Sequence, residues 1–233
     1  MSLVRTATGA LVPVAPDLWI VDHHRVALGL HVRLRMTVVR LPDGDLLLYS
    51  PVPLDDALVA ALDALGPVAH LVAPSGSHHL HAGAAQARWP QARLWGSPAL
   101  PAKRPDLRFD AILEDADGAF QGVFDVTVLR GIPRLQEAVL FHRPSRSLLV
   151  CDLVIHVTEE RHPLTVPLWC ALGVWRRVGS PRAWRLWTKD RAALRTSVDR
   201  VLGWEVDRIV VAHGTIVEEE ARARLAVAMS WLG

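Results

Sequence analysis

Hydrophobic and polar positions near the start of the chain follow the two-residue period of β-strands. Between residues 30 and 41 apolar and polar side chains alternate at first, which is typical of a half-buried strand. Residues 42–45, Pro-Asp-Gly-Asp, favour a tight turn, so the apolar run at 46–49 is predicted to pair back as a hairpin. A shorter apolar run at 18–21 predicts a further strand.

From residue 54 the spacing of apolar residues changes from that of a strand to that of a helix. Residues 54–65 place Leu54, Leu58, Leu62 and Leu65 on one face, which predicts a helix that ends at Gly66-Pro67. The pattern then predicts a parallel crossover unit with a strand at 68–73, a loop at 74–77, a helix at 78–89 and a strand at 92–95.

The second half repeats this mixture of strands and helices. It predicts strands at 123–129, 138–142, 148–154 and 208–212, and helices at 191–202 and 218–232. The segment 164–187 is rich in tryptophan and is predicted to add a packed helical piece. Because no internal repeat or low-complexity linker interrupts the pattern, residues 1–233 are predicted to form a single α/β domain.

Composition narrows the class of protein. The 26 Lys and Arg residues nearly balance the 24 Asp and Glu residues, which argues against a nucleic-acid partner bound through its phosphates. Two cysteines cannot form a disulfide framework, and the first residues do not resemble a secretory signal. The longest apolar stretch, at 164–175, is shorter than the ~20 residues of a spanning helix and contains Pro167. We therefore expect a soluble cytoplasmic protein with no membrane span.

Candidate chemistry appears where apolar strands end. His78 and His79 follow the strand at 68–73, Asp152 ends the strand that begins at 148, and His213 follows the strand at 208–212. Ligands collect at the carboxyl ends of sheet strands. Two or three imidazoles with one carboxylate suit zinc or non-haem iron. These four residues are therefore the predicted metal ligands, although each one alone also fits a hydrogen-bonded structural role.

Several other polar residues are interpreted as structural. Glu137, Cys151 and His142 fit roles inside the core. His23, His24, His156 and His162 are assigned to solvated loops, although either pair could also line the mouth of a pocket. His81 either shares a helix face with His78 or faces solvent.

The order of elements resembles the metallo-β-lactamase fold, an αββα sandwich. Residues 68–81 resemble the strand and loop that carry the His-x-His-x-Asp-His ligand motif of that fold. Residues 148–152 resemble the strand that ends in its bridging aspartate, and residues 209–214 resemble the strand that ends in its last histidine ligand.

More narrowly, the chain is similar to a bacterial and plant branch of metallo-β-lactamase-like proteins that is described as a domain of unknown function. The segments that carry this similarity are 35–41, 50–54, 65–68, 73–74, 78–79, 103–107, 141–148 and 212–214.

The same resemblance implies a reduced metal centre. When the end of the ligand motif falls on His78-His79, its two earlier histidines fall on Pro74 and Gly76, and a third falls on Ile132. None of these side chains binds metals, so the resemblance implies one metal at most, held by His79, Asp152 and His213 with His78 in place of an acid.

The leading hypothesis is a mononuclear metal-dependent hydrolase that acts on an ester, lactone or amide of a small molecule. Zinc is the expected metal and iron the alternative, with His78 and Asp152 as the predicted catalytic residues. Four bound ligands would close a tetrahedral site, in which case His78 is expected to serve as a general base. The Trp-rich segment 164–187 is expected to cover the pocket and favour apolar substrates.

Two other classes stay open. One is a non-catalytic binding module that keeps the fold without a metal, and the other is a redox protein with a single iron. The sequence does not indicate the oligomeric state.

Overall fold

Two mixed β-sheets form the centre of the protein. The computed structural model describes residues 9–27 and 30–233. The strands of the first sheet, in spatial order, are β1 (Val12–Ala15), β2 (Leu18–Ala27), β3 (Leu30–Arg40), β4 (Leu46–Tyr49), β5 (Val68–Ala73), β6 (Arg93–Gly96) and β7 (Ala111–Ile112). The strands of the second sheet are β12 (Arg208–Val211), β11 (Ser147–Val150), β10 (Ala138–His142), β9 (Phe124–Val128) and β8 (Ala116–Gly118).

Strand directions follow the connections predicted from the sequence. β3 and β4 pair antiparallel across the turn at 42–45, whereas β4, β5 and β6 pair in parallel through helical crossovers. In the second sheet, β9, β10 and β11 are antiparallel, and β12 joins β11 in parallel. The predicted hairpin and crossover unit are therefore confirmed.

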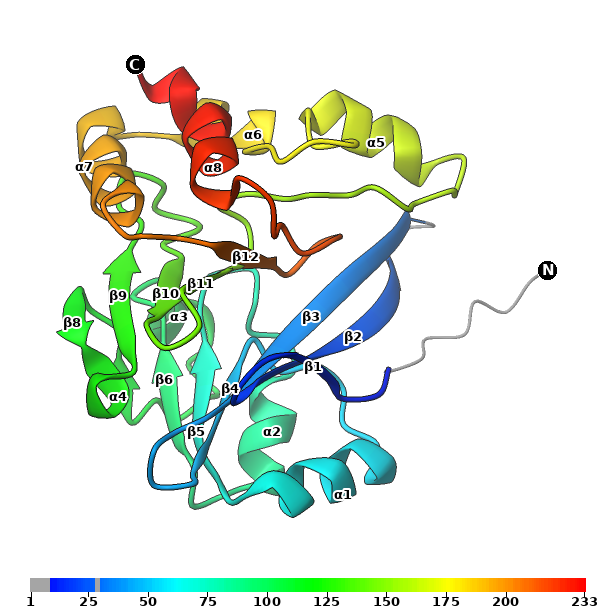
Figure 1. Ribbon diagram of the computed structural model, residues 1–233, viewed down its shortest axis with the longest axis vertical. Helices are drawn as coiled ribbons and strands as arrows, with labels where there is room; N and C mark the ends of the chain where they lie inside the picture. The colour runs from blue at the N-terminus through cyan, green and yellow to red at the C-terminus, as the bar shows by residue number, and fades with distance from the viewer. Residues whose placement is uncertain (1–8, 28–29) are drawn as a thin grey trace.

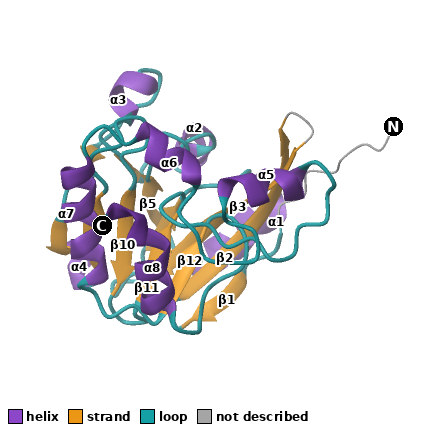
Figure 2. Cartoon of the chain, turned by 90° about the horizontal axis from the view of Figure 1, so that it is seen from above, coloured by secondary structure: helices purple, strands orange, loops and turns teal. Residues whose placement is uncertain are grey.

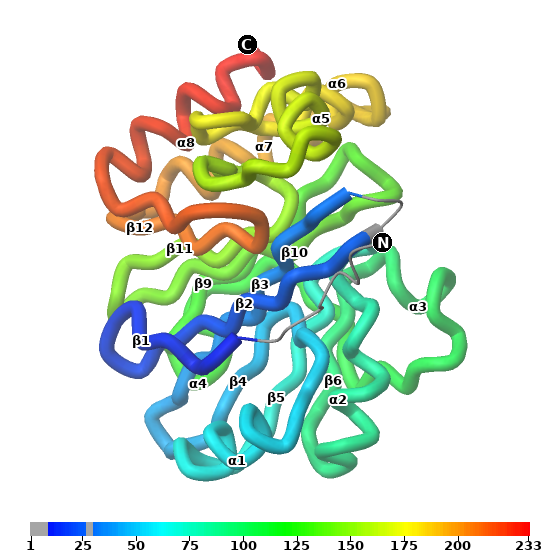
Figure 3. The backbone as a smooth tube through the Cα atoms, turned by 90° about the vertical axis from the view of Figure 1, so that its right-hand side faces the viewer, coloured from blue at the N-terminus to red at the C-terminus, as the bar shows by residue number. Residues whose placement is uncertain are grey.

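Helices cover the outer face of each sheet, which gives four layers in an αββα sandwich (Figure 1; Figure 3). The fold class expected from the sequence is confirmed. Helices α1 (Asp56–Leu65), α2 (Ala82–Arg88) and α3 (Leu100–Lys103) pack on the first sheet. Helices α7 (Arg191–Leu202) and α8 (Ala221–Met229) pack on the second.

The central strands are apolar along their whole length because they are buried on both faces, one against the other sheet and one against the helices. In β4, Leu47 and Tyr49 face the core between the sheets, while Leu46 and Leu48 face the helices. Successive side chains of a strand point to opposite faces, so a strand covered on both faces is hydrophobic throughout. The two sheets therefore share one core.

The Trp-rich segment contains two short helices, α5 (Thr165–Leu172) and α6 (Arg182–Trp187). They lie with α7 and α8 on the side of the second sheet (Figure 2). The hydroxyl of Thr165 accepts a hydrogen bond of 3.0 Å from the backbone N–H of His31, which fixes α5 to the start of β3. Its helical character agrees with the sequence prediction.

Three local predictions are wrong. The strand predicted at 148–154 ends at Val150, so Asp152 lies in the loop that follows it. The helix predicted at 78–89 begins only at Ala82, so His78 and His79 lie in the loop before it. The Ser75 hydroxyl accepts from the backbone N–H groups of Ser77 and His78, and such local bonds compete with helix formation. His23 and His24 lie inside β2 rather than on a loop.

The remaining helix is α4 (Ala119–Gly122), and a single 3-10 turn at Ser230–Leu232 follows α8. Among the described residues, none of the helices is both long and apolar enough to cross a bilayer.

Candidate metal centre

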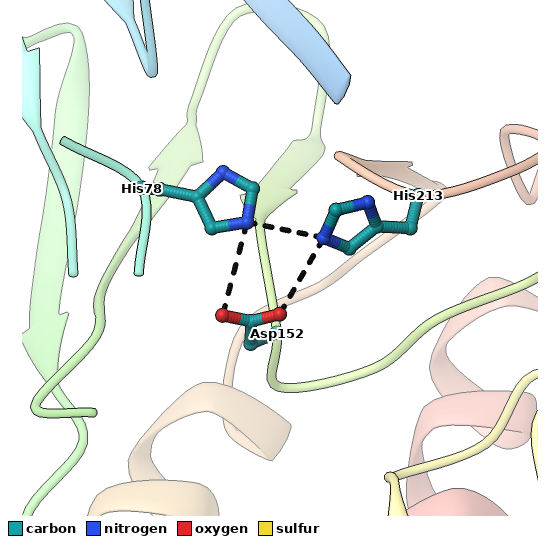
Figure 4. A group of neighbouring side chains, drawn as sticks. All are labelled: His78, Asp152 and His213. Atoms are coloured by element: carbon teal, nitrogen blue, oxygen red, sulfur yellow. Dashed lines mark hydrogen bonds and ion pairs between the residues drawn. The ribbon is translucent and has the colours of Figure 1, made fainter. Parts of the chain in front are cut away.

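Three buried side chains from distant parts of the chain converge at one edge of the sandwich (Figure 4). His78 comes from the loop after β5, Asp152 from the loop after β11, and His213 from the loop after β12. The two Nε2 atoms of His78 and His213 lie 3.1 Å apart. Asp152 places Oδ2 3.7 Å from Nε2 of His78 and Oδ1 3.6 Å from Nε2 of His213.

The spacing of these atoms fits one small cation. Ligands about 2.05 Å from a tetrahedral zinc are separated by roughly 3.3 Å. The two Nε2 atoms lie 3.1 Å apart, and one donor atom from each of the three residues lies within 4.8 Å of the other two. Within the described chain, Oδ2 of Asp152 is buried and receives no hydrogen bond. A buried carboxylate oxygen without a donor is costly. The donor set and this unsatisfied oxygen both fit a divalent metal.

His213 is oriented by a backbone carbonyl. Its Nδ1 lies 2.6 Å from the carbonyl oxygen of Arg33 in β3. A carbonyl only accepts, so Nδ1 carries the proton and Nε2 of the neutral ring keeps its lone pair. Nearby, the buried Arg35 guanidinium binds Asp22 with two hydrogen bonds and donates to the carbonyl of Val211 at 2.8 Å. These contacts fix the end of β12 against β3.

His78 is oriented by a serine. The hydroxyl of Ser50 lies 3.0 Å from Nδ1 of His78. A hydroxyl both donates and accepts, so this pair tolerates either tautomer of the ring. In the absence of a metal, Nε2 of His78 donates to Nε2 of His213. When both Nε2 atoms serve as ligands, Nδ1 carries the proton and Ser50 accepts it. Ser50 itself has a left-handed backbone (φ 57°), which is uncommon outside glycine and clusters at functional sites.

Asp152 is held by a buried glutamate. The carboxylate of Glu137 accepts hydrogen bonds of 2.6–2.8 Å from the backbone N–H groups of Cys151, Asp152 and Leu153. Burial and the charge of Asp152 raise the pKa of Glu137 to about 8. Burial also raises the pKa of Asp152, but His78 and His213 outweigh it and keep that pKa below the usual range. The glutamate therefore has the structural role that the sequence suggested, as the anchor of the Asp152 loop.

His79 does not join the group. Its Nδ1 lies 2.9 Å from a guanidinium nitrogen of Arg104, which is itself paired with Asp106. An arginine only donates, so Nδ1 of His79 accepts this bond. Burial, Lys103 and Arg104 lower the pKa of His79 and favour its neutral form. The structure thus brings together three of the four predicted ligands.

Two positions that align with ligand histidines of the resembled motif make packing contacts in this structure. A side chain at Gly76 would collide with the carbonyl of Arg134, and Ile132 is buried in the core beneath the helices of the second sheet. In the described part of the chain, His78, Asp152 and His213 form the one group of three or more such side chains with ligand spacing.

A cavity of about 260 Å³ opens beside His213. Trp169 lines it and packs with its ring centre 6.3 Å from that of His213, so the Trp-rich segment contributes one wall. Most of the other lining side chains are polar or charged, and they include His24, His31, Arg33, Glu159, Glu160 and Arg161. This lining does not support the expected preference for apolar substrates.

The sequence of residues 16–169 matches the model of one family, described as a domain of unknown function (DUF4336). This match covers more than half of the chain. The chain belongs to the DUF4336 family. No curated protein matches the sequence significantly.

Solved structures place the DUF4336 fold among metallo-β-lactamases. A metallo-β-lactamase from Pontibacter korlensis has a TM-score of 0.66 at 14% identity, covering 95% of this chain and 97% of its own. DIM-1 metallo-β-lactamase exposed to ceftazidime has a TM-score of 0.69 at 13% identity, with 98% and 100% covered. FIM-1 from Pseudomonas aeruginosa, in the mono-zinc form, has a TM-score of 0.65 at 12% identity, with 97% and 96% covered. The family resemblance expected from the sequence is confirmed at the level of the fold.

Three supporting residues were missed by sequence reasoning. Ser50, Arg33 and Arg35 were not singled out as parts of the site, although two of them interrupt the apolar pattern of β3. A charged residue inside a strand that is otherwise buried is the signal that could have identified Arg35.

Proposed function

We propose that this protein is a metal-dependent hydrolase with a single metal ion, held by His78, Asp152 and His213. The observation that carries the proposal is the convergence of donor types that zinc takes, with each imidazole oriented through Nδ1 and each Nε2 directed toward the common centre. Three protein ligands leave one position open, which is the pattern of catalytic rather than structural zinc sites. Because His79 lies outside the group, the site has three protein ligands rather than four, which supports a catalytic site over a closed structural one.

The bound metal would supply Lewis acidity, which activates water and polarises the carbonyl of an ester, lactone or amide. Asp152 has a second role in this proposal. Asp152 would help to hold the metal, and its carboxylate would also be the nearest group to accept a proton from water in the site. His78 then acts as a ligand rather than as the general base. The polar cavity beside His213 receives a small-molecule substrate.

The protein's environment is part of the proposal. Cys151 and Cys170 are both free thiols, as is usual in a reducing compartment. This supports the expected location in the cytoplasm.

The same donor set favours a second candidate. Two histidines and one carboxylate with open positions also suit a mononuclear non-haem iron that performs redox chemistry. The identity of the metal separates the two functions.

The test is metal analysis of protein purified without an affinity tag, followed by hydrolysis assays on p-nitrophenyl esters and homoserine lactones. We expect about one equivalent of zinc and measurable hydrolysis. Asp152→Asn and His213→Ala should lose both, while His79→Ala, the matched control, should keep the metal.

Iron in place of zinc would favour the redox candidate. No metal in the wild-type protein, or equal metal content in all three variants, would contradict the proposed centre and favour a non-catalytic module.

A further inference from the structure

A second, larger cavity lies on the outer side of the second sheet. It has a volume of about 660 Å³ and is bounded by the loop at 176–180, by α6 and by α8. No residue that lines it also lines the cavity at the candidate metal centre. The volume lies within the range of about 300–1,000 Å³ that is typical of small-molecule sites.

The wall of this cavity is strongly cationic. Its ionisable residues are Arg176, Arg177, Arg185, Arg224, His156 and Glu220. Four arginines thus line the cavity with a single glutamate, in a chain whose total charge is only +2. Like charges gathered in one concavity repel one another, and a bound anion relieves that repulsion.

Three of these arginines have no acidic partner in the described chain. Arg176, Arg177 and Arg185 form none of its ion pairs, whereas Arg224 has a long contact of 3.8 Å with the exposed Glu219. Most other arginines of the described chain are paired with Asp or Glu, as at Arg35, Arg143 and Arg195. The cavity therefore concentrates unneutralised charge.

Neighbouring groups hold these arginines in place. The guanidinium of Arg185 lies 5.4 Å from the ring centre of Trp231, and that of Arg176 lies 5.4 Å from the ring centre of Trp175. Arg177 donates from Nε to the carbonyl of Gly173 at 2.7 Å, which leaves its terminal nitrogens available. Stacking on tryptophan fixes an arginine with little loss of its hydrogen-bonding capacity.

We propose that this cavity binds a phosphorylated small molecule. Guanidinium groups bind phosphate oxygens through paired hydrogen bonds, and a phosphate monoester carries about 1.5 to 2 negative charges at pH 7. Several fixed arginines around one hollow match such a compact, multiply charged group better than they match a single carboxylate. The site is independent of the metal-centre proposal because it shares no lining residue with that cavity.

Pyrophosphate is a suitable probe, and isothermal titration calorimetry measures its binding to the purified protein. We expect saturable binding that Arg176→Gln and Arg185→Gln each weaken at least about tenfold, as the loss of a charged hydrogen bond does. Arg93→Gln is the matched control, because Arg93 is also exposed and stacks on a tryptophan, Trp95, but lies outside the cavity. This control should bind within about twofold of the wild type.

Phosphate also binds metal ions, so the titration is repeated with Asp152→Asn, which removes a predicted metal ligand. We expect this variant to retain pyrophosphate binding, which would locate the bound pyrophosphate away from Asp152. This conclusion holds whether or not a metal binds at the candidate centre. Four results would overturn the proposal: no saturable binding, binding lost with Asp152→Asn, equal loss in Arg93→Gln, or tighter binding of citrate than of pyrophosphate.

Discussion

At the scale of single residues, two serine–histidine pairs have similar contacts in different surroundings. Ser50 lies 3.0 Å from Nδ1 of His78 at the candidate metal centre, and Ser145 lies 2.6 Å from Nδ1 of His142 at the end of β10. Both histidines are buried. Removing each hydroxyl in turn therefore distinguishes an effect on the metal site from a general effect on stability.

Ser50→Ala should therefore weaken zinc binding by ~10- to 100-fold, the usual effect of losing a partner that orients a metal ligand. Competition with a chromophoric chelator measures this affinity. Ser145→Ala is the control and should leave the affinity unchanged. Equal affinities in both variants and the wild type would show that Ser50 does not orient His78.

His142 has a consequence for stability at acidic pH. Burial lowers its pKa from 6.5 to about 4 in the folded protein. Between these values the unfolded chain binds more protons, so the free energy of unfolding falls by about 3 kcal/mol as the pH decreases from 6.5 to 4. In urea titrations between pH 6.5 and 4, the free energy of unfolding of His142→Gln should fall less steeply than that of the wild type. The same dependence of the free energy of unfolding on pH in both proteins would show that His142 is not its source.

The sequence predicted the chemistry of the site better than its geometry. His78, Asp152 and His213 were identified because each follows an apolar strand that ends at the same edge. His79 was included because the family resemblance aligned it with the last histidine of the ligand motif, whereas the structure places His78 in the group instead. Their separation depends on Arg104, a long-range contact from the loop after α3 that no local pattern reveals.

At the scale of elements, the end of β12 depends on one glycine. Gly214 follows His213 with φ 104°, and a β-carbon there would collide with the carbonyl of His156. The backbone N–H of Thr215 donates to that same carbonyl at 2.7 Å. The close approach of the two segments fixes the position of His213.

Gly214→Ala should therefore displace His213 and reduce zinc affinity at least about tenfold. The control is Gly44→Ala, because Gly44 has a similar φ of 93° but open space around it. That substitution should cost about 1 kcal/mol of stability and leave zinc affinity intact. The same chelator competition measures both variants, and a larger loss of affinity in Gly44→Ala would contradict this role.

Element prediction succeeded for the continuous apolar runs and for the alternating strand β3, and it missed the outer half of β2. β4 and β11 are continuous apolar runs, so they were readily identified. The outer half of β2 carries polar residues, with His23 buried and His24 exposed, and its pairing with β3 shows it to be a strand. Tertiary pairing thus overrode the local pattern.

At the scale of the whole molecule, the candidate centre joins the two halves of the sandwich. His78 follows a strand of the first sheet, whereas Asp152 and His213 follow strands of the second. A metal that binds all three stabilises the folded state over the unfolded chain, by about 4 kcal/mol at a free concentration 1,000 times its dissociation constant.

Chelation should therefore lower the melting temperature of the wild-type protein and leave that of Asp152→Asn unchanged. Differential scanning calorimetry with and without EDTA measures the shift. An equal shift in the two proteins would mean that the chelator acts somewhere other than this centre.

The most direct measurement of the central claim is an anomalous difference map from crystals grown with zinc, with data collected on both sides of the zinc absorption edge. We predict a single peak in contact with Nε2 of His78, a carboxylate oxygen of Asp152 and Nε2 of His213, with the side chain of His79 directed toward Arg104. A map without a peak among these three side chains, or with His79 as a ligand, would contradict the account.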